Sequence, residues 1–289
     1  MAIKIVTDST SDIDREIQQK LDITIIPLTV HFPDESFVEG HISLEYFYSK
    51  LEKSPVIPTS SQPSSGDIQV VFERLIAQGH DIIAIFLSSK ISGTYENALS
   101  ARETILKQYP DAKIEIIDSL NTAMALGYPV IEIAREAQAG RPFEELTQYA
   151  RQLIDRMRFY FVPATLEYLR KGGRIGSAAA LVGSILDLKP VLYYANGLTA
   201  VAKKVRSMRG AVKHMLRILE ADCQKHGLQA VIVQHINSLS KAKELAQTIK
   251  DKYNMAVSIV AVGPVVGLHV GPGTLGIMYC LARSSQKIT

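Results

Sequence analysis

The stretch IIAIFLSSKISGTY, residues 82–95, joins a continuous apolar run to a polar turn and then to an amphipathic segment that continues to Lys107. A short apolar run followed by a helical pattern predicts a buried strand that leads into a helix. The same alternation recurs through the first half of the chain, so we expect a mostly parallel sheet with helices on both faces. The expected strands are Ile3–Val6, Ile23–Val30, Ile82–Leu87 and Ile114–Ile117, and the expected helices are one ending near Lys20 and Leu44–Lys53, Ile68–Ala77, Tyr95–Lys107 and Ala123–Gln138.

The second half of the chain has a different pattern. Asn196-Gly197 lies between two apolar runs, which is the strongest short-range signal for a β-hairpin and therefore predicts a mixed sheet. We place a domain boundary near residue 160, with an N-terminal α/β domain over residues 1–159 and a C-terminal mixed α/β domain over residues 160–289. The expected strands here are Tyr160–Val162, Val191–Tyr194, Leu198–Val205, Ala230–Gln234, Val257–Val262 and Leu275–Leu281, the last two around a glycine-rich loop, and the expected helices are Leu166–Arg170, Ala211–Gln224 and Ala242–Lys252.

Composition supports a folded two-domain protein and excludes several classes of function. The chain has 289 residues, 47% of them hydrophobic, and a net charge of +3, which is too small to indicate binding to nucleic acid. Cys223 and Cys280 lie far apart, so neither a zinc site nor a disulfide framework is expected. We expect no signal peptide, because Met1–Lys4 leads directly into an apolar strand, and no bilayer-spanning segment, which would need about 20 apolar residues. The sequence therefore predicts a cytoplasmic protein.

The turn Ser92-Gly93-Thr94 is the first candidate binding element. It follows a strand and opens a helix, where unpaired N–H groups and the helix dipole attract an anion. Gly93 permits close approach of a ligand, and the hydroxyls of Ser92 and Thr94 add donors. The alternative is an ordinary helix cap.

Three further segments are candidates, each with an ordinary structural alternative. Thr59-Ser60-Ser61-Gln62 is rich in hydroxyls and lies between prolines, but it also fits a surface loop. The segment 263–273 contains four glycines, two prolines and His269, which is either an anion donor or a core histidine. The segment 169–176 carries Arg170, Lys171 and Arg174, which suit either an acidic partner or an exposed helix end.

Several motifs are missing from the sequence. No GxGxxG follows the first strand and no GxxxxGK[ST] occurs, so the chain is not expected to bind a nucleotide of its own. Neither HExxH nor a GxSxG after a strand is present, and no His/Cys/carboxylate cluster indicates a metal. We therefore expect no cofactor and no metal.

Taken together, these segments resemble the DegV family of bacterial fatty-acid-binding proteins, which includes the binding subunits of fatty acid kinase. The likeness covers essentially the whole chain, and its specificity comes from the order of motifs that are individually weak. The matching segments are residues 7–12 (TDSTSD), 60–64 (SSQPS), 92–95 (SGTY), 118–119 (DS), 172–175 (GGRI) and 263–273 (GPVVGLHVGPG).

The resemblance implies a two-domain α/β protein that holds one fatty acid between its domains, with the acyl chain in a buried tunnel. By motif position, the carboxylate ligands would be Ser92, Gly93, Thr94, Ser60 and His269. The family usually has Thr where Ser60 stands and Thr59 precedes it, so the choice between these two hydroxyls stays open. By the same resemblance, Arg170 and Arg174 would face a partner kinase, and Arg206 is added as a looser candidate.

We therefore expect a carrier, without a catalytic residue of its own, that binds a long-chain fatty acid and presents its carboxylate to a fatty acid kinase, feeding phospholipid synthesis. Its contact with the membrane would be transient at most. Two alternatives remain: a hydrolase of the esterase type with Ser92 as nucleophile and His269 as base, and a protein that binds a small phosphorylated metabolite. The sequence does not specify the length or unsaturation of the fatty acid.

Overall fold

The computed structural model describes residues 2–181 and 188–282 of the chain. Contacts divide the chain into two compact units: Met1–Ile42 with Ser60–Ile154, and Ser43–Thr59 with Asp155–Thr289. The predicted two-domain α/β fold is confirmed, and the division after Ile154 lies a few residues before the expected boundary. The sequence did not indicate that Ser43–Thr59 groups with the second unit.

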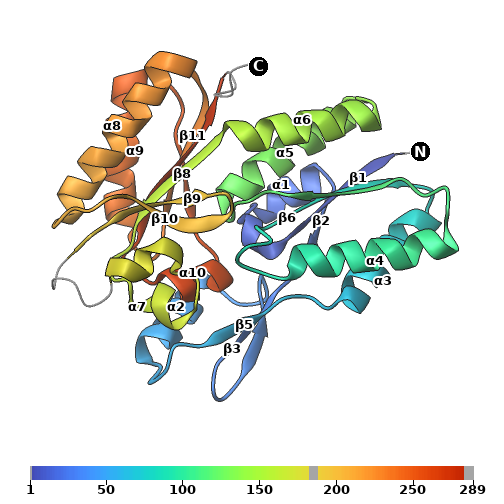
Figure 1. Cartoon of the computed structure of the whole chain (residues 1–289), viewed down its shortest axis with the longest axis horizontal. Coiled ribbons are helices and arrows are strands. Elements are labelled where there is room, and N and C mark those ends of the chain that lie inside the picture. Colours follow the sequence, from blue (N-terminus) through green and yellow to red (C-terminus); the bar gives the residue numbers. More distant parts are fainter. Residues whose placement is uncertain (1, 182–187, 283–289) are drawn as a thin grey trace. The chain divides into compact units, whose positions relative to one another are not determined.

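The first unit contains a parallel sheet with strand order β2-β1-β6-β7. Helices α3 and α4 pack on one face of it, around Phe72, Phe86 and Ile105, and α5 contacts β1 and β6 from the other side (Figure 1). Both faces are covered, which explains why the strands are continuous apolar runs. The elements are β1 (Ile3–Asp8), α1 (Arg15–Lys20), β2 (Ile23–Ile26), β3 (Thr29–His31), β4 (Ser36–Val38), β5 (Thr59–Ser61), α3 (Ser65–Ala77), β6 (Asp81–Phe86), α4 (Thr94–Gln108), β7 (Ile114–Asp118), α5 (Met124–Gln138) and α6 (Phe143–Arg156).

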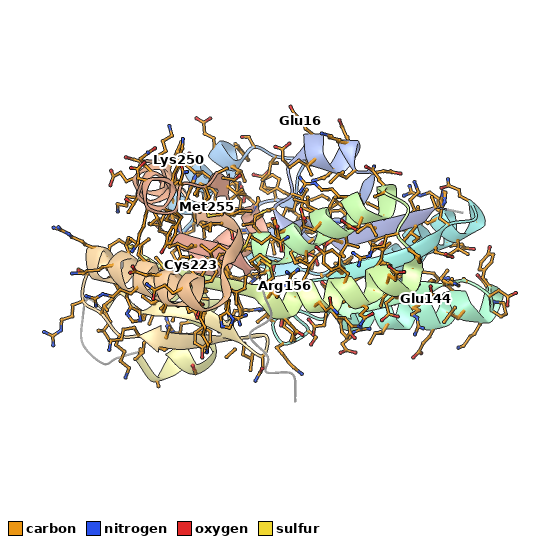
Figure 2. All side chains as sticks on the ribbon, turned by 90° about the horizontal axis from the view of Figure 1, so that it is seen from above. Glu16, Glu144, Arg156, Cys223, Lys250 and Met255 are labelled. Atoms are coloured by element: carbon orange, nitrogen blue, oxygen red, sulfur yellow. The ribbon has the colours of Figure 1, made fainter. Side chains whose placement is uncertain are left out.

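The first half differs from the expectations in two places. The single strand expected over Ile23–Val30 is divided at Pro27-Leu28, so that β2 stays in the parallel sheet and β3 joins a separate small sheet of order β4-β3-β5. Proline has no N–H to donate to a strand ladder, which accounts for the break. Helix α6 was not expected at all, and Figure 2 shows it between the labelled side chains of Glu144 and Arg156.

The second unit contains a mixed sheet with strand order β10-β9-β8-β13-β11-β12. Its neighbouring strands are antiparallel except for the parallel pair β11 and β12. The expected hairpin turn at Asn196-Gly197 is present, and both residues have the positive φ angles (50° and 85°) that such a turn requires. The elements are α2 (Leu44–Lys53), β8 (Met157–Val162), α7 (Glu167–Lys171), the 3₁₀ helix Gly176–Leu181, β9 (Val191–Ala195), β10 (Leu198–Lys203), α8 (Met208–His226), β11 (Leu228–His235), α9 (Leu239–Tyr253), β12 (Ser258–Ala261), α10 (Pro264–Val270) and β13 (Leu275–Leu281).

Helices α8 and α9 cover one face of this mixed sheet, and their inner residues pack with Val233, Ile277 and Tyr279 of the sheet. Figure 2 labels Cys223 on α8 and Lys250 on α9. Among the described residues, the hydrophobic cores of the two units have no member in common, because each is assembled around the sheet of its own unit.

The segment 263–273 is not the irregular glycine-rich loop that we expected. It contains helix α10, which begins with Pro264 at its first position and ends at Gly271, whose φ is 91°. Proline suits the first helical position because its missing N–H would have no partner there, and glycine suits the left-handed conformation after a helix. Pro264 and Gly271 thus mark the start and the end of a helix, which the sequence did not reveal because the many glycines of this segment indicated a loop.

Candidate ligand-binding site

The carboxyl edge of the first unit's sheet is the first part of the candidate site. From β1 the chain continues to β2 on one side, whereas β6 leads to β7 on the other side, so the loops after β1 and β6 diverge at this edge. Ligands of open α/β sheets bind at such a switch point. Asp8 ends β1, and its Oδ2 accepts a hydrogen bond of 2.8 Å from the N–H of Leu87, which follows β6. Burial raises the pKa of Asp8 to about 6.

Ser92 and Thr94 lie together in the loop after β6. Their side-chain oxygens are 3.0 Å apart, and the N–H of Thr94 donates to Ser92 Oγ at 3.3 Å. The N-cap of α4 is Gly93, which has no side chain to cap this helix with a hydrogen bond. Since each hydroxyl carries one proton and their mutual bond uses only one, the pair retains a proton that can be donated to an anion.

The loop containing Ser60 is tied to this turn by two hydrogen bonds within the first unit. Gly93 N–H donates to Gln62 Oε1 at 3.1 Å, and Asn97 Nδ2 donates to the carbonyl oxygen of Pro63 at 2.8 Å. The sequence did not reveal that Gln62 bonds the turn at Gly93, although Gln62 belongs to the same motif as Ser60. The N–H of Gly93 is consequently engaged, and an anion would have to displace Gln62 to use it.

Thr59 and Ser60 are neighbours in strand β5 and therefore point to opposite faces of that strand. Thr59 is exposed and Ser60 is partly buried. Ser61, on the same face as Thr59, has its Oγ 2.8 Å from Nε2 of His31. The two candidate hydroxyls thus cannot contact one carboxylate from the same face of β5.

His269 lies on α10 and packs against α7 in the second unit. A methyl group added at Gly172 would collide with Nδ1 of His269, so the glycine permits this close packing. The guanidinium of Arg174 donates to the carbonyl oxygen of Gly172 at 2.7 Å. Burial, assisted by the positive charge of Arg174, lowers the pKa of His269 to about 4, so the imidazole is neutral at neutral pH.

The three candidate docking arginines therefore differ in position. Arg170 is exposed on α7, and Arg206 is exposed immediately before the N-cap of α8. Arg174 is partly buried and stands beside His269.

An apolar pocket lies within the second unit, and its described lining comes from that unit; the unfilled space there is about 310 Å³, part of which is open to solvent. Val266 and Val270 contribute to it from consecutive turns of α10, the helix that carries His269. The opposite wall is the face of the mixed sheet that carries Phe159 and Phe161, which is not the face covered by α8 and α9. The described lining residues are Phe159, Phe161, Tyr194, Gln234, His235, Ile236, Val262, Val266, Val270, Thr274 and Gly276.

The sequence alone did not identify this pocket. The alternation of Phe159, Tyr160 and Phe161 was the available signal, because residues two apart in a strand share a face. Placing the strand's start at Tyr160 left Phe159 outside it. Even with the correct start, the sequence does not reveal which face is left uncovered by helices.

Two features are absent from the part of the chain that the structure describes. Across 2–181 and 188–282, none of the helices combines the length and apolar character that a bilayer crossing requires. In the same ranges, no three His, Cys, Asp or Glu side chains are grouped so that they could hold a metal ion.

Comparisons with known proteins agree with this architecture. The model of the DegV family, described as uncharacterised proteins, matches residues 2–282. A DegV domain-containing protein of Clostridium acetobutylicum is 44% identical over 286 residues, covering 99% of this chain and all of the relative. Two solved structures have a similar fold. DegV of Bacillus subtilis, a fatty acid binding protein, has a TM-score of 0.87 and 31% identity, covering 97% of this chain and 99% of its own. A stearic acid-binding protein of Eubacterium ventriosum has a TM-score of 0.89 and 27% identity, covering 97% and 98%.

Proposed function

The chain belongs to the DegV family, and from this premise we propose that it binds one long-chain fatty acid and presents the carboxylate to a separate ATP-dependent fatty acid kinase. In this proposal the protein is a carrier in the cytoplasm, and the resulting acyl phosphate is passed on toward phospholipid synthesis. Relatives of the same fold that bind fatty acids support the first part of the proposal.

The observation that carries the proposal is the apolar pocket against α10. Its wall consists mainly of aromatic and aliphatic side chains, which suit methylene groups and offer little to a compact polar ligand. Transfer of about a dozen methylenes from water contributes on the order of 10 kcal/mol before the costs of ordering the chain and losing rigid-body freedom. The acyl chain therefore supplies the affinity.

The carboxylate then needs hydrogen-bond donors more than a countercharge, since an unsatisfied buried charge is costly. We propose Ser92, Thr94 and His269 as the main donors, with Ser60 favoured over Thr59 because Ser60 is the partly buried one. Gly93 would contribute only after Gln62 has moved away from its N–H. A neutral His269 fits this arrangement, because it donates a hydrogen bond without forming a salt bridge that would bind the reacting oxygen tightly.

For the kinase-docking surface we propose Arg170, with Arg206 as a second candidate, because both are exposed. Arg174 has a different proposed role. Its bond to the carbonyl oxygen of Gly172 and its place beside His269 suit it to positioning that histidine.

Native mass spectrometry of the purified protein tests lipid binding. We expect a mass increment that corresponds to one fatty acid and disappears after extraction with organic solvent. An apo mass, together with failure of added stearate to displace a fluorescent fatty acid, would contradict the proposal.

The kinase step has its own test. With purified fatty acid kinase and ATP, Ser92→Ala should lower acyl-phosphate formation, whereas Arg170→Ala should lower it without changing the affinity for stearate. Unchanged phosphorylation by the Arg170 variant would remove that residue from the docking surface.

The two alternative functions predict different results in these assays. A hydrolase of the esterase type would turn over a chromogenic ester in a manner that Ser92→Ala abolishes. A phosphometabolite-binding protein would release its fluorescent fatty acid when a small phosphorylated metabolite is added, and stearate would compete poorly.

A further inference from the structure

Gln234 occupies an unusual position on the uncovered face of the mixed sheet. In the strand register it lies opposite Gly276 of β13, and Gly276 in turn lies opposite Phe161 of β8. Directly opposed residues of antiparallel strands project from the same face. The side chain of Gln234 therefore enters the same apolar pocket as that of Phe161, and both line it.

The amide of Gln234 is deeply buried without a hydrogen-bond partner. Its residue is 1% exposed, and neither Nε2 nor Oε1 has a partner among the residues that the structure describes. Other polar groups of the lining are engaged: Thr274 Oγ1 donates to the carbonyl oxygen of Gly271 at 2.7 Å, and Nδ1 of His235 accepts from Ser238 N–H at 3.3 Å. Buried polar groups are nearly always paired, so this amide requires an explanation.

The neighbouring glycine, Gly276, offers the amide no side-chain partner. A side chain at Gly276 would come within 2.9 Å of the ring of Phe159 and 3.2 Å of Cβ of Phe161, so the position has no space for one. Across the sheet, Gln234 consequently faces a backbone without a side chain, in a pocket whose other walls are mainly aromatic and aliphatic. No described group of the lining approaches closely enough to bond the amide.

We propose that Gln234 makes this pocket selective for a long-chain fatty acid that carries a hydroxyl group within its acyl chain. This inference rests on the proposed fatty-acid-binding function and deepens it. Because both the amide N–H₂ and the amide oxygen need partners, the matching ligand group must accept and donate, as a hydroxyl does. A saturated chain would leave the amide unsatisfied, and a site built for a hydroxyl discriminates against analogues that lack it.

The test measures displacement of a fluorescent fatty acid by stearic, 10-hydroxystearic and 12-hydroxystearic acids, for the wild type and for Gln234→Met. We expect the wild type to bind at least one hydroxy acid about tenfold more tightly than stearic acid. In Gln234→Met, which keeps the side-chain length and removes the amide, the preference should vanish and stearic acid should bind more tightly than it does to the wild type.

Gln247→Met is the matched control, because it makes the same replacement on the exposed side of α9, outside the pocket lining, and it should leave the preference unchanged. Equal or tighter binding of stearic acid by the wild type overturns the inference, and this comparison stands even if Gln234→Met fails to fold. If the wild type shows no preference and stearic acid still gains affinity in Gln234→Met, an ordered water serves the amide in place of a ligand hydroxyl, and the inference is likewise overturned. If no acid displaces the probe from the wild type, the fatty-acid-binding function itself fails.

Discussion

At the scale of single residues, burial shifts the pKa values of Asp8 and His269 in opposite directions, because one side chain is charged when deprotonated and the other when protonated. Asp8 is fully buried among strands that meet at the carboxyl edge of the parallel sheet, and hydrogen bonds from Thr10 and Leu87 only partly offset its desolvation. The ring of His269 is neutral in the folded protein at any pH well above 4. Each shift gives stability a pH dependence of definite sign.

Asp8→Asn should flatten the dependence of unfolding free energy on pH. The folded state holds the Asp8 proton up to about pH 6, whereas the unfolded chain releases it near the ordinary pKa of 3.8. Stability should therefore fall as the pH rises through this window, by roughly 3 kcal/mol from this group. Urea unfolding at a series of pH values measures the slope. Asp67→Asn is the control with opposite sign, since hydrogen bonds from Ser64 lower the pKa of Asp67, and an unaltered slope in Asp8→Asn would refute the assignment.

The ring of His269 should titrate with a midpoint near pH 4 in the folded protein. The unfolded chain takes up this proton near the ordinary pKa of 6.5, so the contribution to stability is present above that pH and is lost as the pH falls toward 4. Proton NMR of the ring measures the midpoint. Arg174→Gln should raise it, because the charge of Arg174 contributes to lowering the pKa; a wild-type midpoint near 6.5 would contradict a neutral anchor.

At the scale of elements, the packing of α7 against α10 decides where His269 stands. Gly172 ends α7 and allows the imidazole to approach the backbone, and Gly267 of α10 similarly gives room to the phenol of Tyr48 from α2. That phenol donates to the carbonyl oxygen of Val262 at 2.8 Å, which links α2 to the segment preceding α10. The grouping of Ser43–Thr59 with the second unit thus has a local physical basis.

Gly172→Ala should displace the imidazole of His269 and destabilise the protein by about 1–3 kcal/mol through overpacking. Lipid retention in native mass spectrometry should decline together with the melting temperature. Gly66→Ala provides a control, since an added methyl group there makes only an ordinary contact of 3.7 Å with Ser64 Oγ. If both variants melt like the wild type, the close approach of α7 and α10 is not required for folding.

At the scale of the whole molecule, the cores of the two units share no described residue and the pocket lies inside one unit, which predicts an uneven response to ligand. A fatty acid that binds in the pocket stabilises the native state by mass action, by about 2.7 kcal/mol at a ligand concentration one hundred times Kd. The stabilisation should appear first in the elements that line the pocket. These are β8, β9, β11, β13 and α10 of the second unit.

Stearate should therefore slow amide hydrogen exchange in β8, β11 and β13 more than in β6 and β7 of the first unit's sheet. Exchange measured by mass spectrometry with and without stearate checks this. Gln234→Met serves as a variant whose pocket remains apolar and which should keep the same pattern. Protection that is strongest in β6 and β7 would place the acyl chain away from the pocket.

Local sequence patterns by themselves determined several strands, one hairpin and the family of this protein. Continuous apolar runs specified β6 and β13, the Asn196-Gly197 turn specified its hairpin, and the order of motifs along the chain indicated the family, because each signal lies within a few neighbouring residues. Only the tertiary structure decided that Phe159, Gln234 and Gly276 share one pocket wall. These residues are far apart in sequence and meet through strand register, and a shift of one position would turn every side chain of a strand to the opposite face.

The tertiary structure also decided the state of the turn Ser92-Gly93-Thr94. Its residues predicted an anion-binding helix start, but in the fold the N–H of Gly93 already donates a hydrogen bond to Gln62. The sequence could not show this bond, because it joins two loops that are distant in the chain.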